Sequence, residues 1–131
     1  MFFNIDPSNG LAIYDQVVRQ VKFAVAAGML KPTELVPSVR EVARELAINP
    51  NTVARAFRQL QADGVLEPIR GTGLQVTADA PDRCRRERLE LIHGRLRLVL
   101  REARQSRLDA KELRTLIETE LNHLEQEEAA Q

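Results

Sequence analysis

Hydrophobic residues recur at steps of three and four near the start of the chain. Between Leu11 and Ala27 this spacing predicts an amphipathic helix with one apolar side, and Gly28 is placed to end it. The apolar side comprises Tyr14, Val17, Val18, Val21, Ala24 and Val25. Residues 31–37 contain two prolines, which disfavour a helix between them. We therefore expect one long helix followed by an irregular connection.

Two further helix starts come in quick succession. Ser38 and Glu41 have the spacing of a capping box, in which each side chain satisfies a backbone N–H at the helix start, and the helix runs to about residue 47. Asn49 then precedes Pro50, which suits the first position of the next helix because proline lacks an N–H. The inward side of this helix would be Val53, Ala56, Phe57 and Leu60. With about two residues between them, the helices must cross steeply.

Two short runs rich in β-forming residues follow, over residues 65–70 and 74–77. They flank Gly71-Thr72-Gly73, which predicts a hairpin with a glycine-permitted loop. The resulting order of helices and strands is that of a winged helix-turn-helix. Gly and Pro become scarce after Pro81, so we place a domain boundary near residue 80, with a head over residues 1–79 and a tail over residues 80–131.

The tail pattern predicts a helical hairpin. One helix runs from Asp82 to about Gln105, and the next begins at Asp109, with Ser106 as an alternative cap. The apolar surface is wider than one neighbouring helix needs. The leucines could pack only within the hairpin, but two stripes on one helix favour self-association. The residues expected at the dimer interface are Leu89, Leu91, Ile92, Leu96, Leu98, Val99, Leu113, Leu116, Ile117, Leu121 and Leu124. The fold class is thus mostly α with a small β-hairpin: an N-terminal winged helix-turn-helix and a two-helix dimerisation tail.

Composition limits the function classes. The 131 residues leave room for one small domain with an appendage, which excludes a large multidomain enzyme. The formal charge is zero, but residues 82–107 hold nine arginines against four acids, and residues 108–131 hold two basic groups against seven acids. The apolar stretch from Phe23 to Leu30 is too short to span a bilayer, and the start lacks the pattern of a secretion signal. We therefore expect a cytoplasmic location.

The polar residues left outside after packing indicate nucleic-acid binding. They are Ser38, Arg40, Arg44, Asn51, Thr52, Arg55 and Arg58 on two adjacent helices, and Arg70 beside the wing turn. Arginine binds phosphates or guanine, asparagine matches adenine, and serine and threonine bond phosphates. Arg44 and Arg58 could instead be solvated partners of nearby acids such as Glu41, Glu45 and Asp63. The alternative function for the whole protein is a winged-helix adaptor that binds another protein.

Several ordered motifs carry a family resemblance. They are Ile13-Tyr14-Asp15-Gln16, Leu30-Lys31-Pro32, Pro37-Ser38-Val39-Arg40-Glu41, Asn49-Pro50-Asn51-Thr52-Val53, Arg55-Ala56-Phe57 and Arg70-Gly71-Thr72-Gly73. In these residues the chain resembles the GntR family of bacterial transcription regulators, and its short helical tail is most similar to the YtrA subfamily. Thr33-Glu34-Leu35 departs from the family's usual glycine-acidic turn, and Gln75 stands where an aromatic residue often anchors the wing.

The resemblance implies a dimeric repressor, often of its own operon and of genes for an ABC transporter. It implies that Arg40 contacts DNA from the second helix and that Asn51, Thr52 and Arg55 form the recognition face. Gly71, Thr72 and Gly73 would form a wing that enters the minor groove. The two-fold symmetry of a dimer would require a pseudo-palindromic DNA operator as the partner. An unknown small-molecule inducer would have its place at the dimer interface.

Other chemistry is weakly supported by the sequence. Cys84 lies among arginines, a setting that could lower the thiol pKa and make a redox sensor, although an incidental thiol is the simpler interpretation. His93 and His123 lack the further ligands that a metal site needs. No catalytic motif or cofactor-binding loop is present, so we expect neither an enzyme nor a cofactor.

Overall fold

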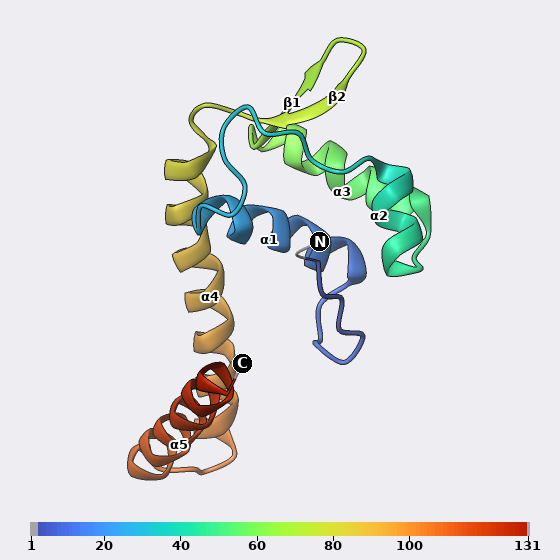
Figure 1. The fold of residues 1–131 in the computed structure, drawn as a ribbon. Coiled ribbons are helices and arrows are strands. Elements are labelled where there is room, and N and C mark those ends of the chain that lie inside the picture. Colours follow the sequence, from blue (N-terminus) through green and yellow to red (C-terminus); the bar gives the residue numbers. More distant parts are fainter. Residues whose placement is uncertain (1–2, 131) are drawn as a thin grey trace. The chain divides into compact units, whose positions relative to one another are not determined.

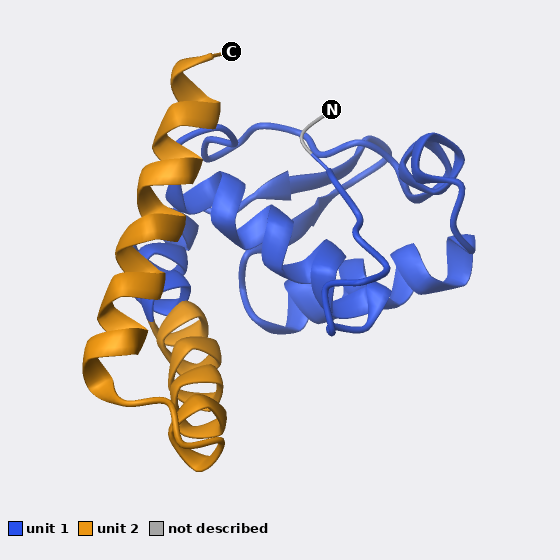
Figure 2. Cartoon of the chain, turned by 90° about the horizontal axis from the view of Figure 1, so that it is seen from below, with its two compact units in different colours: residues 1–89 blue, residues 90–131 orange. Residues whose placement is uncertain are grey.

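The computed structural model describes residues 3–130 (Figure 1). Within them the elements are α1 (Ile13–Ala26), α2 (Val39–Leu46), α3 (Pro50–Ala62), β1 (Leu66–Ile69), β2 (Gly73–Val76), α4 (Ala80–Gln105) and α5 (Ala110–Ala129). The mostly helical class with one antiparallel hairpin is confirmed. Figure 2 colours two compact units, which meet between Leu89 and Glu90 within α4. The domain boundary near residue 80 stays a prediction, since α4 starts there but its first turns belong to the first unit.

The core of the first unit lies between α1, α3 and the base of the hairpin. Val17, Val21 and Val25 of α1 are buried, as the helical spacing predicted. The inward residues predicted for α3 are also buried: Val53, Ala56, Phe57 and Leu60. Burying these apolar side chains is the main favourable contribution to folding. The core leaves the opposite side of α3 in solvent.

Both predicted caps at the paired helices are present. The Glu41 N–H donates to the Ser38 hydroxyl at 3.1 Å, and the Ser38 N–H donates to the Glu41 carboxylate at 3.3 Å. The Asn51 N–H donates to the Asn49 side chain at 2.8 Å. Ala47 ends α2 in the left-handed conformation with φ of 53°, and this reverses the chain. The caps therefore fix the short turn that makes α2 and α3 a helix-turn-helix.

The hairpin is shorter and shifted relative to the prediction. Arg70 lies in the turn, and Gly73 begins β2 opposite Ile69. Gln75 pairs with Glu67 across the strands, with its amide donating to the carboxylate at 2.8 Å. This polar pair occupies the position for which the family resemblance suggested an aromatic anchor.

The connection over residues 31–37 adds an edge to the hairpin. The Thr33 N–H donates to the Val76 carbonyl at 2.9 Å, and the Val36 N–H donates to the Leu74 carbonyl at 3.0 Å. The Val76 N–H returns a bond to the Glu34 carbonyl at 3.0 Å. The sequence prediction of an irregular connection missed this pairing, because flanking prolines hide a strand signal. The wing is therefore anchored to α2 through this segment.

Thr33 adopts a φ of +70°, a region that β-branched residues rarely occupy. We predict that Thr33→Gly raises the free energy of unfolding by about 0.5–1 kcal/mol, because the released strain exceeds the entropy that glycine adds to the unfolded chain. Urea denaturation measures this change. Thr72→Gly, at a turn residue without positive φ, is the matched control and should give no gain. A loss of stability in Thr33→Gly would contradict the expectation.

The second unit contains the rest of α4 and α5. Asp109 caps α5 by accepting the Glu112 N–H at 2.8 Å, whereas the Ser106 hydroxyl donates to the Ala103 carbonyl at 2.7 Å. Asp109, and not Ser106, is therefore the N-cap of α5. In the described chain, no helix combines the length and apolar character needed to cross a bilayer.

Candidate nucleic-acid interface

The predicted DNA-binding side chains lie on the outside of the first unit. Thr52 is half-buried, and the others are exposed: Ser38, Arg40, Arg44, Asn51, Arg55, Arg58, Arg70, Gly71, Thr72 and Gly73. Their placement follows from the core, because the buried sides of α2 and α3 use Val42, Ala43 and Val53. Charged and amide groups therefore occupy the solvent sides of both helices.

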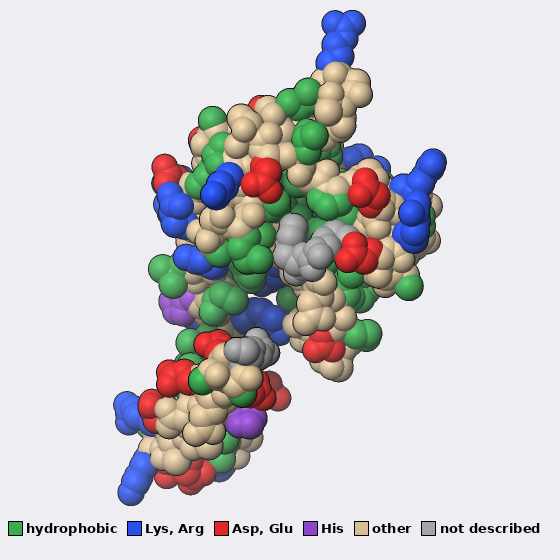
Figure 3. Space-filling model, in the orientation of Figure 1, with side chains coloured by type: hydrophobic (Ala, Val, Ile, Leu, Met, Phe, Trp, Pro, Cys, Tyr) green, Lys and Arg blue, Asp and Glu red, His purple; other side chains and the backbone are tan. Residues whose placement is uncertain are grey.

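The structure brings the wing and the start of α2 together. Ser38 of α2 and Thr72 and Gly73 of the wing line one groove of about 570 Å³. Phe57 and Leu74 form part of its apolar wall. In Figure 3, Lys and Arg side chains extend from the tip of the hairpin and gather over α2. Hydroxyl groups from the cap of α2 and from the wing turn thus border one groove, and Glu41 also lines it.

Arg55 is held in place by an aromatic ring that the sequence did not indicate. Its guanidinium lies 4.3 Å from the centroid of the Tyr14 ring. This cation–π contact limits the orientations of the arginine while leaving it exposed. The Tyr14 hydroxyl donates to the Gln59 side chain at 3.1 Å, which fixes the ring in turn. No local spacing links Tyr14 to Arg55, because they are far apart in sequence.

Glu41, Glu45 and Asp63 were the acids considered as partners of Arg44 and Arg58, and two of them bind other groups. Glu41 completes the capping box of α2. Asp63 accepts hydrogen bonds from Lys22 and Gln59. The arrangement therefore weakens the interpretation that these arginines serve only to neutralise nearby carboxylates.

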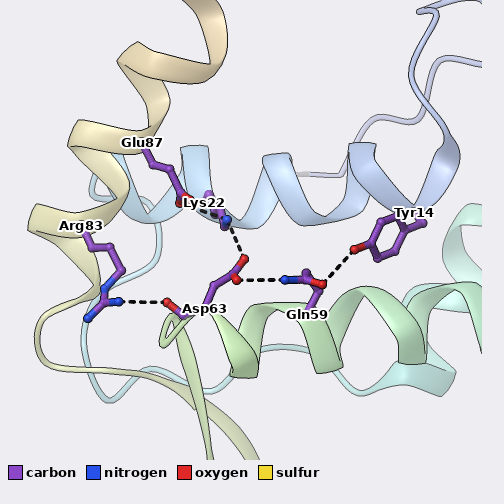
Figure 4. Close-up of polar contacts among 6 residues, drawn as sticks. All are labelled: Tyr14, Lys22, Gln59, Asp63, Arg83 and Glu87. Atoms are coloured by element: carbon purple, nitrogen blue, oxygen red, sulfur yellow. Dashed lines mark hydrogen bonds and ion pairs between the residues drawn. The ribbon is translucent and has the colours of Figure 1, made fainter. Parts of the chain in front are cut away.

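A chain of polar contacts runs from α1 through the end of α3 to the start of α4 (Figure 4). The Lys22 ammonium lies 2.8 Å from the Asp63 carboxylate and 3.0 Å from the Glu87 carboxylate. Burial disfavours the charged amine, but the hydrogen bonds and charges of both acids outweigh it, so the Lys22 pKa is raised. The sequence analysis did not predict a role for Lys22. The one indication available was that this lysine lies between Val21 and Val25, on the apolar side of the helix.

The structure contradicts the alternative that Cys84 is a redox sensor and agrees with the simpler interpretation of an incidental thiol. Its side chain is fully buried in the core of the first unit. Burial and the nearby Glu87 carboxylate raise the thiol pKa to about 11, against the opposing effects of Lys22 and Arg83. The neighbouring arginines in sequence therefore do not create the cationic setting that the pattern suggested, because Cys84 points inward.

We predict that native Cys84 reacts with iodoacetamide at pH 8 about 100-fold more slowly than in the urea-unfolded chain. At a pKa of about 11, roughly one thiol per thousand is ionised at pH 8, against about one in ten for an unperturbed thiol. Intact mass after timed alkylation gives both rates. Equal rates in the folded and unfolded protein would contradict this.

A capped helix pair, a donor-rich recognition side and an adjoining wing define a winged helix-turn-helix DNA-binding protein. Residues 13–76 match the family described as bacterial regulatory proteins of the gntR family, and the chain belongs to this family. It is a DNA-binding transcription regulator rather than an enzyme.

Individual relatives extend the similarity beyond the head. The chain is 33% identical over 106 residues to the HTH-type transcriptional repressor YtrA of Bacillus subtilis, which covers 81% of this chain and 76% of YtrA. An alignment of that length cannot fit within the first unit, so it includes part of the tail.

Solved structures agree with this assignment. A GntR family transcriptional regulator from Listeria monocytogenes matches with a TM-score of 0.68 at 25% identity, over 88% of this chain and 98% of that one. YtrA from Sulfolobus acidocaldarius, a GntR-family transcription factor, matches with a TM-score of 0.57 at 29% identity. That match covers 73% of this chain and 97% of the archaeal protein.

Proposed function

We propose that the protein is a homodimeric repressor that binds a pseudo-palindromic operator controlling its own operon. The observation that carries this proposal is the joint presence of a donor-rich α2–α3 surface and an unpaired apolar stripe on the tail. The Bacillus subtilis relative is a transcriptional repressor, which supports repression rather than activation by this protein. Because an operator is chromosomal DNA, the proposed location is the cytoplasm.

The DNA contacts are assigned by element. Arg40 and Arg44 of α2 reach the phosphates or bases beside the major groove, and Ser38 bonds a phosphate. Asn51, Thr52 and Arg55 of α3 form the base-reading side, with Arg58 nearer its end. Arg70, Gly71, Thr72 and Gly73 of the wing contact the adjacent minor groove. The exposure of these residues and the shared groove at Ser38 and Thr72 support the assignment.

The tail supplies the proposed dimer contact. On α4 the exposed stripe comprises Leu89, Ile92, Leu96 and Val99, and on α5 it comprises Ile117, Leu121 and Leu124. Leu98 and Leu116 are exposed outside these stripes, and Leu91 is half-buried. Leu113 is buried within the second unit and is thus part of the packing of one chain. Covering apolar stripes of this length is the usual reason for helices to pair.

Charge complementarity favours a second copy as the partner of these stripes. Arg97, Arg101 and Arg104 border an apolar groove of about 620 Å³ on α4, together with Leu96 and Leu100. Helix α5 carries Glu118, Glu120, Glu125, Glu127 and Glu128. An acidic helix from a second chain would therefore place carboxylates near these arginines at the edge of an apolar contact.

Dimerisation also explains how a head with little net charge can hold DNA. Residues 37–78 carry five arginines and four acids, a balance of +1. Phosphate contacts from one such head give weak binding at physiological salt. Two linked heads gain affinity through effective concentration, provided that the half-sites lie about one helical turn, or roughly 10 base pairs, apart.

The proposal is tested by gel shift on the region upstream of the protein's own operon. We expect a complex that survives excess unrelated duplex and that weakens steeply with salt. Unrelated DNA of the same length is the matched control. Equal binding to both duplexes, or no complex at low salt, would contradict the proposal, and the second result would favour the protein-interaction adaptor.

An inducer at the dimer interface stays a prediction. The α4 groove lies within the volume range of small-molecule sites, and its three arginines would suit an anionic ligand with an apolar body. A bound molecule there would change the packing of the two tails and so the distance between the heads. A thermal-shift screen followed by operator release tests this.

A further inference from the structure

The polar chain of Figure 4 joins the recognition helix to the tail helix through side chains that the DNA interface does not use. Starting under Arg55, it passes from the Tyr14 hydroxyl to Gln59 at 3.1 Å, and from the Gln59 amide to Asp63 at 2.9 Å. Asp63 then binds Lys22, which binds Glu87 on α4. The contacts thus connect the exposed side of α3 with the first turns of α4.

Lys22 of α1 contacts side chains from the end of α3 and from α4. Its side chain is only 6% exposed, whereas Asp63 and Glu87 are 27% and 33% exposed. One buried ammonium therefore binds two carboxylates that come from the end of α3 and from α4. The buried ammonium is compensated only while both carboxylates stay in place, because removing either partner leaves the remaining charges poorly compensated. The ion cluster therefore depends on the relative orientation of the elements that carry it.

The apolar contacts of α4 with the head are small by comparison. Ala80 and Cys84 lie one turn apart and are fully buried. Arg83 and Glu87 form the neighbouring row, and the Arg83 guanidinium donates to the Asp63 carbonyl at 3.2 Å. Two small side chains offer few apolar contacts that would resist a rotation of α4, whereas Arg83 and Glu87 bind α4 to the head at two successive turns. The polar row thus fixes the rotation of α4 at the head.

We propose that Lys22 is a positioning residue for operator spacing, because it holds the end of α3 and the start of α4 in one fixed relation. The proposal rests on the dimeric function above. Helix α4 continues unbroken to Gln105 and carries the exposed stripe, so a change at its first turns would be passed along the helix to the proposed dimer contact. A one-base-pair change in spacing moves a half-site along and around the duplex, and a rigid dimer tolerates this poorly.

The test is selection of duplexes from a random pool by each full-length variant, followed by sequencing. For the wild type we expect inverted repeats of one half-site motif at one spacing. Glu87→Gln and Lys22→Met should recover the same half-site motif with several spacings. In binding assays on the selected duplexes, a one-base-pair change should cost the wild type about tenfold in affinity and the variants less than about threefold.

Two control variants separate a positioning role from a general loss of stability. Glu90→Gln removes the same charge at an exposed site of α4 and should keep the wild-type spacing. Lys22→Arg keeps the cation and should restore the single spacing. Glu87 is partly exposed, so Glu87→Gln should fold even if Lys22→Met does not.

The possible results distinguish the two proposals. A single spacing in Glu87→Gln would overturn the positioning role, as would loss of the half-site motif in the variants. If the wild type itself recovers no inverted repeat, the dimeric operator function fails, and the role of Lys22 in spacing fails with it.

Discussion

Leu121→Glu should make the protein monomeric at micromolar concentration and weaken operator binding by about 100-fold or more. Leu121 lies on the exposed stripe of α5 and is 48% exposed, so a charge there costs little within one chain. In the proposed dimer the same charge would enter an apolar contact without a partner. Sedimentation velocity measures the mass, and anisotropy titration of the operator measures the affinity.

Asn122→Glu is the matched control for this substitution. It adds the same charge on the same turn of α5 but at a polar exposed position. We expect it to remain dimeric and to bind the operator within about twofold of the wild type. A dimeric Leu121→Glu protein, or a monomeric one that binds as tightly as the wild type, would remove the stripe from the dimer interface.

Arg40→Ala should weaken operator binding by about 1–3 kcal/mol per head, and hence by roughly twice that for a dimer. Arg40 is exposed at the second position of α2. A contact with a base would lower affinity for the operator more than for unrelated DNA. A contact with a phosphate would lower both and would reduce the salt slope by about two for a dimer.

Arg86→Ala provides the comparison. It removes an exposed arginine from α4, outside the proposed interface. We expect its affinity and salt slope to match those of the wild type. If Arg40→Ala also leaves both quantities unchanged, Arg40 does not contact DNA, and the assignment of α2 must be revised.

Local signals explain which parts of the fold could be predicted from the sequence. The caps at Ser38, Asn49 and Asp109 depend on neighbours within three residues, and all three are present. The buried side of α3 follows from a periodic pattern, and the pattern was sufficient. Such features require no knowledge of distant contacts.

Contacts between distant segments could not be predicted in this way. The edge that residues 31–37 add to the wing depends on hydrogen bonds to β2, about 40 residues away. Tyr14 supports Arg55, and Lys22 binds Asp63 and Glu87, only because α1 packs beside α3 and α4. The burial of Cys84 also depends on distant contacts, and the exposed arginines beside it in the sequence do not indicate it.

Hydroxyl-radical footprinting of the full-length protein on the region upstream of its own operon distinguishes two linked heads from a single DNA-binding head. We expect protection of one inverted repeat, with the two protected half-sites centred about one helical turn, or roughly 10 base pairs, apart. Protection of a lone half-site, or of no defined sequence, would contradict the account of two linked heads that read a two-fold symmetric operator.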